Sequence, residues 1–213
     1  FLGTKKYPEV GSFKKFLDEH SGGSNAYTAG AITNYFFQIS HEGFDIALDR
    51  FSDFFKAPLF DKTYSEREVK AVNNEHQKNK LNDGWRGSFV SKQISEPGHP
   101  LTMFGTGNQD TLSGDNRPAL LDFYEKYYSA SNMKLALISN IPMQNLFGIA
   151  KKYFSGIPSR EVNVPSMPKV FRKPLKNKFR LLKVKTIKDI RSLEVDFPTI
   201  RLNDYQNSKP AGI

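Results

Sequence analysis

Apolar side chains recur at helical spacing along one segment more clearly than anywhere else in the chain. Between residues 44 and 55 they fall at i, i+3, i+4, i+7, i+10 and i+11, in the order Phe44, Ala47, Leu48, Phe51, Phe54 and Phe55. This periodicity predicts a helix that buries an aromatic face. Pro58 follows shortly after and favours an end to the helix before it.

Weaker patterns predict the remaining elements of the first 158 residues. An apolar stripe predicts a short helix over 12–20, and two runs around Ala29-Gly30 predict a hairpin of strands 24–28 and 33–40. Further patterns predict a long polar helix over 65–94, an irregular segment over 99–116, a helix after Pro118, a strand over 134–138 and a helix over 142–154.

The end of the chain has a different composition. Four prolines lie between residues 155 and 177, a density typical of a linker, and the runs 179–185 and 192–197 predict strands. We therefore predict an α+β fold with a mixed, largely antiparallel sheet packed against helices. The predicted organisation is a first domain over 1–158, a Pro-rich basic linker over 159–177, and the beginning of a second domain over 178–213.

Composition narrows the possible classes of protein. The 213 residues are 38% hydrophobic and 25% charged, which is typical of a globular protein, and no apolar run approaches the length of a membrane span. The absence of cysteine excludes disulfides and thiol catalysis within this sequence. Because the sequence also has no Asn-x-Ser/Thr site, we expect a cytoplasmic protein.

The net charge of +9 is concentrated in residues 151–191, which hold 13 Lys and Arg side chains but only Glu161 and Asp189 as acidic ones. Such a block is compatible with a polyanion-binding module. It is more typical of a solvated linker and strand surface, and it has few of the interleaved aromatic side chains that single-strand binders use. We expect no specific nucleic-acid partner.

Histidines and glycines give no complete site. The histidines at 20, 41, 76 and 99 are not spaced to place two on one helix face, whereas a catalytic zinc needs three protein ligands. The run from Gly105 to Asp110 begins like a dinucleotide-binding loop, but Asp110 stands where the third glycine belongs and no strand precedes it.

Two carboxylates on the polar helix are the best candidates for chemistry. Glu68 and Glu75 are two turns apart on one face, on a stripe that Asn79, Asn82 and Arg86 would continue. The rise between the glutamates is roughly 10 Å, so both cannot bind one zinc ion, and the second could only orient a ligand. The alternatives are a solvated helix face and, for Glu68, a capping box that begins at Ser65.

A series of motifs in order along nearly the whole chain resembles the insulysin-like branch of the insulinase/pitrilysin family, the inverted-motif zinc peptidases. The stretches that carry the resemblance are Phe1-Leu-Gly-Thr-Lys-Lys-Tyr-Pro8, Ser24-Asn-Ala-Tyr-Thr28, Thr33-Asn-Tyr-Phe-Phe37, Arg67-Glu-Val-x-Ala-Val-x-x-Glu-His76, Asn82-Asp-x-Trp-Arg86, Phe104-Gly-Thr-Gly-Asn108, Tyr127-Tyr-Ser-Ala-x-Asn-Met133 and Ile187-Lys-Asp-Ile-Arg191.

The resemblance implies a zinc metalloendopeptidase of short or unfolded peptides, with a zinc-activated water as nucleophile. It assigns Glu75 as the third zinc ligand and Glu68 as the carboxylate that orients a ligand. We therefore expect both side chains to point inward, toward the cleft that the strand with Asn25 borders, and Glu75 to be buried there. Asn25 and Ala26 would lie on the strand that pairs with the substrate backbone, so we expect Asn25–Thr28 to form an edge strand. Phe1, Tyr27 and Trp85 match positions near the apolar substrate pockets.

The resemblance also implies what the chain would lack. In this family the His-x-x-Glu-His motif lies immediately before the stretch that begins at Phe1, so we expect both histidine ligands and the general base to be missing and the chain alone to be inactive. Partners would be a peptide substrate and the C-terminal half of the same protein or a homologous subunit. The alternative is a non-catalytic relative that serves as a structural or peptide-binding partner.

Overall fold

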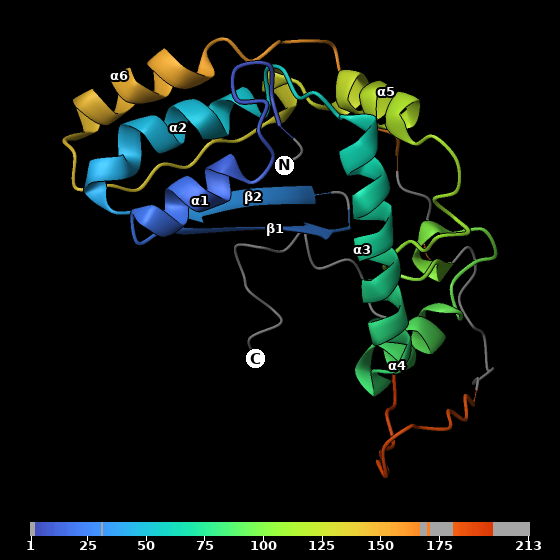
Figure 1. The fold of residues 1–213 in the computed structure, drawn as a ribbon. Helices are drawn as coiled ribbons and strands as arrows, with labels where there is room; N and C mark the ends of the chain where they lie inside the picture. Colours follow the sequence, from blue (N-terminus) through green and yellow to red (C-terminus); the bar gives the residue numbers. More distant parts are fainter. Residues whose placement is uncertain (1–2, 31, 167–169, 171–180, 198–213) are drawn as a thin grey trace.

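The computed structural model describes residues 3–30, 32–166, 170 and 181–197. Within these ranges the chain is α+β, as predicted, with helices around a two-stranded antiparallel hairpin (Figure 1). The elements are α1 (Ser12–Glu19), β1 (Gly23–Ala29), β2 (Ile32–Gln38), η1 (His41–Gly43), α2 (Phe44–Asp53), α3 (Lys62–Lys80), α4 (Asp83–Lys92), η2 (Pro100–Thr102), α5 (Arg117–Tyr127), η3 (Ala130–Asn132) and α6 (Met143–Phe154). No described helix is long and apolar enough to cross a membrane.

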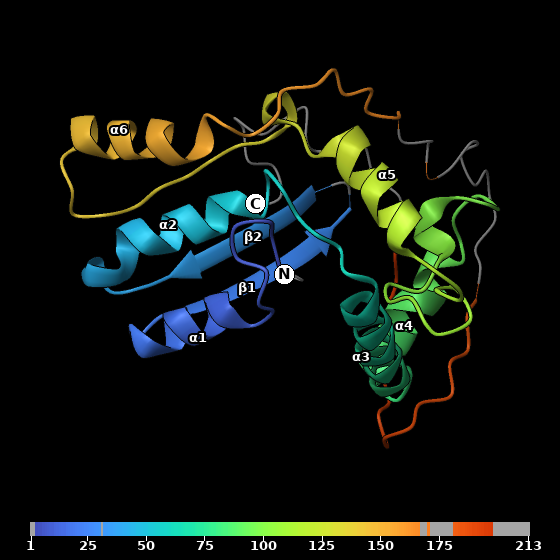
Figure 2. The ribbon, with the colours of Figure 1, turned by 45° about the horizontal axis from the view of Figure 1, so that its top comes forward.

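The core lies where α1 and α2 pack against the hairpin, with α6 along the outer side of α2 (Figures 1 and 2). The predicted aromatic face of α2 is buried, and Ala47 and Leu48 are fully inaccessible. Phe13 of α1 meets Phe37 of β2 edge to face, with ring centroids 5.7 Å apart. Such offset contacts add to the free energy gained by removing these rings from water.

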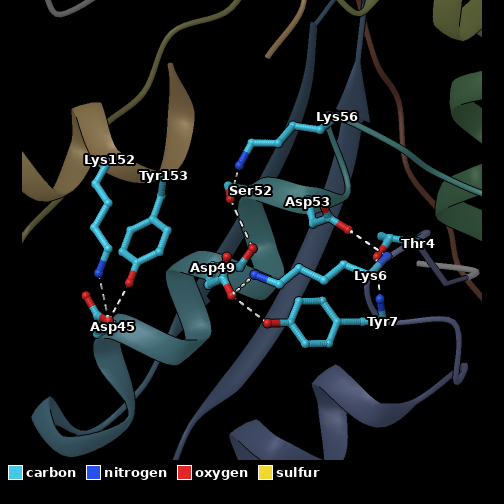
Figure 3. Close-up of polar contacts among 10 residues, drawn as sticks. All are labelled: Thr4, Lys6, Tyr7, Asp45, Asp49, Ser52, Asp53, Lys56, Lys152 and Tyr153. Carbon is cyan, nitrogen blue, oxygen red and sulfur yellow. Dashed lines mark hydrogen bonds and ion pairs between the residues drawn. The ribbon is translucent and has the colours of Figure 1, made fainter. Parts of the chain in front are cut away.

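Polar side chains fasten the segment before α1 to α2 (Figure 3). Lys6 Nζ and the Tyr7 hydroxyl both donate to Asp49 Oδ2, each at 2.5 Å. Burial alone would raise the pKa of Asp49, but the hydrogen bonds from Lys6 and Tyr7 outweigh it and lower the pKa. At the other end of α2, the Tyr153 hydroxyl of α6 donates to Asp45, so α2 is the element to which its neighbours are tied.

The long polar helix predicted over 65–94 is wrong in two respects, because it begins earlier and is broken. Asp61 is the N-cap of α3, with Oδ1 accepting from the Tyr64 amide at 3.2 Å, so Ser65 lies inside the helix and no capping box forms there. Asn82 adopts an extended backbone after Lys80 and caps α4 through its side chain, which accepts from the Trp85 amide at 3.2 Å. The cap supplies an acceptor for a free helical N–H, so the chain can turn and start a new helix.

Three predicted strands are absent from the ranges that the structure describes. Residues 134–138 form no strand, and neither do residues 181–185 and 192–197. A strand needs a neighbour to satisfy its backbone, and an apolar run alone does not supply one. Residues 179 and 180, and most of the predicted linker and second domain, lie outside the described residues.

The aromatic core leads to a prediction for Leu17, which is fully buried between α1 and α2. Replacing it by alanine should destabilise the chain by about 2–5 kcal/mol, because buried apolar contacts are lost and a cavity remains. Urea unfolding followed by circular dichroism measures this. Lys15→Ala, on the exposed side of the same helix, should change stability by less than about 0.5 kcal/mol. Equal effects of the two substitutions would contradict the packing described.

The lowered pKa of Asp49 predicts a pH dependence. The carboxylate stabilises the fold fully above its ordinary pKa of 3.8, and this stabilisation is lost as the pH falls through the lower value of the folded state. The difference in unfolding free energy between the wild type and Asp49→Asn should therefore be on the order of 1 kcal/mol near neutral pH and should shrink below pH ~3.8. Asp18→Asn on the exposed face of α1 is the control. A difference that stays constant down to pH 2 would refute the contribution of the charge.

Candidate functional site

β1 is an edge strand of the sheet that the described residues form, as predicted. It pairs only with β2 in this sheet, in a register that places Asn25 opposite Phe36 and Ala26 opposite Tyr35. Asn25, Ala26 and Tyr27 are all exposed, and the Asn25 Oδ1 atom accepts from the Ala26 amide at 2.8 Å. The other long edge of β1 is thus the place where a further strand could add.

A cavity of about 370 Å³ opens beside this strand. Its walls combine the first residues of β1 with aromatic side chains from four other segments; they are Gly3, Ser24, Asn25, Ala26, Tyr35, Phe54, Pro58, Phe60, Tyr124 and Tyr128. The sequence reasoning identified only Asn25 and Ala26 among them. Tyr128 belongs to the family motif that begins at Tyr127, which could have marked it as a candidate. Sequence spacing could not show which residues surround Tyr128 in space.

Tyrosine hydroxyls are held in fixed positions around this cavity. The hydroxyls of Tyr35 and Tyr128 are hydrogen-bonded to each other, and Tyr124 donates to the Phe55 carbonyl at 2.8 Å. Burial raises the pKa of both Tyr124 and Tyr128, and the hydrogen bond with Tyr35 raises that of Tyr128 further. These phenols therefore stay neutral near pH 7 and act as structural hydrogen-bonding groups.

The two candidate glutamates of α3 are exposed to solvent. We expected Glu68 and Glu75 to point inward and Glu75 to be buried, and this expectation of burial is wrong. The stripe predicted to run on through Asn79 is also divided, because Asn79 is buried and α3 ends one residue later. The assignment of Glu75 as a metal ligand stays a prediction, as does the role of Glu68.

A zinc site needs several ligand side chains that converge on one point. Among the described residues, no group of three His, Cys, Asp or Glu side chains is placed to hold a metal ion. A zinc site needs three protein ligands, so Glu75 could supply one and the residues described here do not complete the set. No catalytic step can be derived through zinc from this chain alone.

The opposite face of α3 is covered by a loop that contains residues 104–111. His76 is buried, and its Nδ1 atom lies 3.1 Å from the Thr106 carbonyl oxygen, a geometry in which a protonated Nδ1 donates. The Gln109 amide donates to Asn73 Oδ1 at 3.2 Å. Glu75 is thus on the open side of a helix whose other side is fixed in place.

Trp85, predicted to lie near a substrate pocket, is on the first turn of α4 and is 39% exposed. Its indole packs on Phe104, with ring centroids 5.8 Å apart and planes 30° from parallel. A large apolar ring that is anchored on one side and open on the other suits contact with a ligand. Phe1, the other predicted pocket residue upstream of β1, lies outside the described residues.

The same turn of α4 holds a distant part of the chain. Asp83 accepts from the amides of Ile187 and Lys188 at 2.9 and 3.0 Å, and Arg86 Nη2 donates to the Lys185 carbonyl at 3.1 Å. The two backbone hydrogen bonds lower the pKa of Asp83. Residues 185–188 are therefore hydrogen-bonded to the first turn of α4. The contact joins the motif that begins at Asn82 to the one that begins at Ile187, about a hundred positions apart in the sequence.

Comparisons with known proteins agree on one family. The family model described as "Insulinase (Peptidase family M16)" matches residues 1–98, and that described as "Peptidase M16 inactive domain" matches residues 116–212. The division that we predict at residue 158 stays a prediction.

Individual relatives match over nearly the whole chain. "Insulin-degrading enzyme" of Homo sapiens is 42% identical over 99% of this chain, and "Putative zinc protease mug138" of Schizosaccharomyces pombe is 41% identical over 93%. The chain spans 21% of the length of each of these relatives. A crystal structure of pitrilysin superimposes with a TM-score of 0.75 at 37% identity, over 80% of this chain and 19% of that one. The chain belongs to the insulinase family of peptidases, family M16.

Proposed function

We propose that this chain carries the substrate strand and one metal ligand of a zinc-dependent metalloendopeptidase that hydrolyses short or unfolded peptides. The observation that carries the proposal is the edge strand β1, whose exposed Asn25 and Ala26 border an aromatic cavity. Membership of a peptidase family that includes a relative named as a zinc protease gives the reaction class.

Strand addition explains how such a site would select unfolded peptides. A peptide that pairs with β1 must present its own backbone N–H and C=O groups, which a folded protein has already used. The alternate side chains of that peptide would point toward the two faces of the sheet, where Tyr27 of β1 offers apolar contact. Trp85, on α4, is a second proposed apolar contact for the peptide. This recognition depends on the peptide backbone and needs only a general apolar preference from the side chains.

Zinc enters the proposal through Glu75 alone. When bound, the ion would supply the activated water that attacks the peptide bond. The 213 residues contain no His-x-x-Glu-His sequence, so the remaining ligands and the general base would come from elsewhere in the protein. We propose that Glu68 orients a ligand, and that the C-terminal half of the protein or a homologous subunit completes the enclosure around the substrate.

The isolated chain should therefore show no zinc-dependent cleavage. With one candidate ligand and no positioned base, a fluorogenic peptide should remain intact in the presence of added zinc. The measurement is fluorescence release with and without a chelator, on chain purified to remove host peptidases. Chelator-sensitive cleavage by the 213 residues would show that the ligands and base had been assigned to the wrong part of the protein.

The role of Glu75 can be tested in a longer protein that includes a His-x-x-Glu-His segment. Glu75→Gln should sharply weaken zinc binding, since a neutral amide is a poorer zinc ligand than a carboxylate. Glu68→Gln should reduce activity about 10- to 100-fold, the range for groups that orient metal ligands. Zinc content by mass spectrometry and peptide cleavage give the two readouts.

Glu66→Gln, nine residues before Glu75 on the exposed surface of the same helix, is the matched control and should change neither readout. If Glu75→Gln retains full zinc content, Glu75 is not a ligand.

The alternative function is that of a non-catalytic, peptide-binding relative. It predicts that the longer protein binds peptides but does not cleave them when zinc is present.

A further inference from the structure

Trp85 is fixed by the loop that follows η2, although 39% of its surface is exposed. Phe104 lies at the centre of an aromatic cluster on this loop, with ring centroids 5.8 Å from Trp85, 5.4 Å from Phe89 and 4.9 Å from His76. Of these rings, Phe104 is the one that packs on the indole. The edge of the indole is contacted by the next residue of the loop, Gly105.

Gly105 lies directly against the six-membered ring of Trp85. A Cβ atom at this position would be 2.7 Å from Trp85 Cζ3, closer than real Cβ atoms approach a neighbour, and 3.4 Å from Cη2, an ordinary contact distance. Gly105 is not among the glycines with positive φ, so its backbone would accept another residue. The reason for glycine at this position is therefore the space taken by the indole, and the indole edge rests against the bare backbone of the loop.

Hydrogen bonds to α3 hold the loop in a defined position. Thr106, the next residue, contacts buried His76 through its carbonyl oxygen, and the amide of Gln109 donates to Asn73. Both anchors are on α3, which bears Glu75 on its exposed side. The loop therefore fixes the position of the Trp85 indole, through Gly105, relative to the helix that bears the candidate metal ligand.

We propose that Gly105 is a specificity-determining positioning residue, which sets the tilt of the Trp85 indole and so the shape of the apolar surface offered to a peptide side chain. The part of this inference that concerns peptides rests on the proposed function. The part that concerns the indole stands on the contacts above. A side chain at position 105 would push the indole outward, and would narrow the space available for large apolar side chains of the peptide.

The positioning can be measured directly because Trp85 is the single tryptophan of the chain. In Gly105→Ala, the displaced indole should show a red-shifted emission maximum and a larger acrylamide quenching constant than in the wild type. Gly87→Ala, on the same helix as Trp85, is the matched control, since a Cβ there would meet nothing within 4 Å. Wild-type emission and quenching in Gly105→Ala would overturn the inference.

A double-substitution cycle separates positioning from a general requirement for glycine. Gly105→Ala should lower the thermal unfolding midpoint when Trp85 is present and should have little effect in the Trp85→Ala background, where the clash is gone. An equal loss in both backgrounds would mean that Gly105 serves the loop and does not act on the indole.

The peptide part is tested by titrating short alanine peptides that carry Phe, Leu or Ala at one central position, with Trp85 emission as the signal. We expect the wild type to bind the Phe peptide more tightly than the Ala peptide, and Gly105→Ala to reduce that ratio while Gly87→Ala preserves it. An unchanged ratio in Gly105→Ala would overturn the assignment of specificity. If no peptide alters wild-type emission, the proposed function and the peptide part of the inference both fail, whereas the emission shift of Gly105→Ala still decides the positioning part.

Discussion

The aromatic face of α2 must be covered, and the rest of the described structure follows from how the hairpin covers it. Phe51 of α2, together with Phe54 and Phe55 directly after its last residue, is buried against the inward side chains of β2. Because successive strand residues point to opposite faces, Tyr35 and Phe37 pack inward while Phe36 stays 47% exposed. The helices therefore cover the face of the hairpin that carries Tyr35 and Phe37, while β1 pairs only with β2 and keeps its other edge open in the described sheet. The backbone that could receive a peptide is thus part of a strand held by the packed core.

The second half of the site is organised by loops that pack on helices. α3 and α4 are fixed on one side by the 104–111 loop, through His76 and Phe104, and at the start of α4 by residues 185–188, through Asp83. The side that carries Glu68 and Glu75 is left open. A carboxylate that must meet a metal or a neighbouring part of the protein benefits from such a frame, because the helix is already oriented before the ligand set is complete.

Sequence reasoning succeeded where one element determines its own structure and failed where the outcome depended on a partner. The spacing of Phe44 to Phe55 identified α2, and the order of the family motifs identified the family. The sequence did not predict the helix break at Asn82, because the polar pattern continues through residues 65–94 and hides the N-cap that the Asn82 side chain provides for α4. The exposure of Glu75 and the pairing of 134–138 depend on neighbours in space, which spacing does not report. The sequence placed Gly105 in a glycine-rich run and in a family motif, but its contact with the indole of Trp85, which belongs to a different motif, could not be read from either.

The most direct test of the central claim is amide hydrogen exchange along β1 and β2, measured by NMR on the 213-residue chain with and without a short unfolded peptide. If the peptide adds to the free edge, the amides of β1 that face away from β2 should exchange more slowly with peptide bound, while the amides that already pair the two strands should change little. Protection that appears around α3 and α4 but leaves β1 unchanged would contradict the assignment of β1 as the substrate strand.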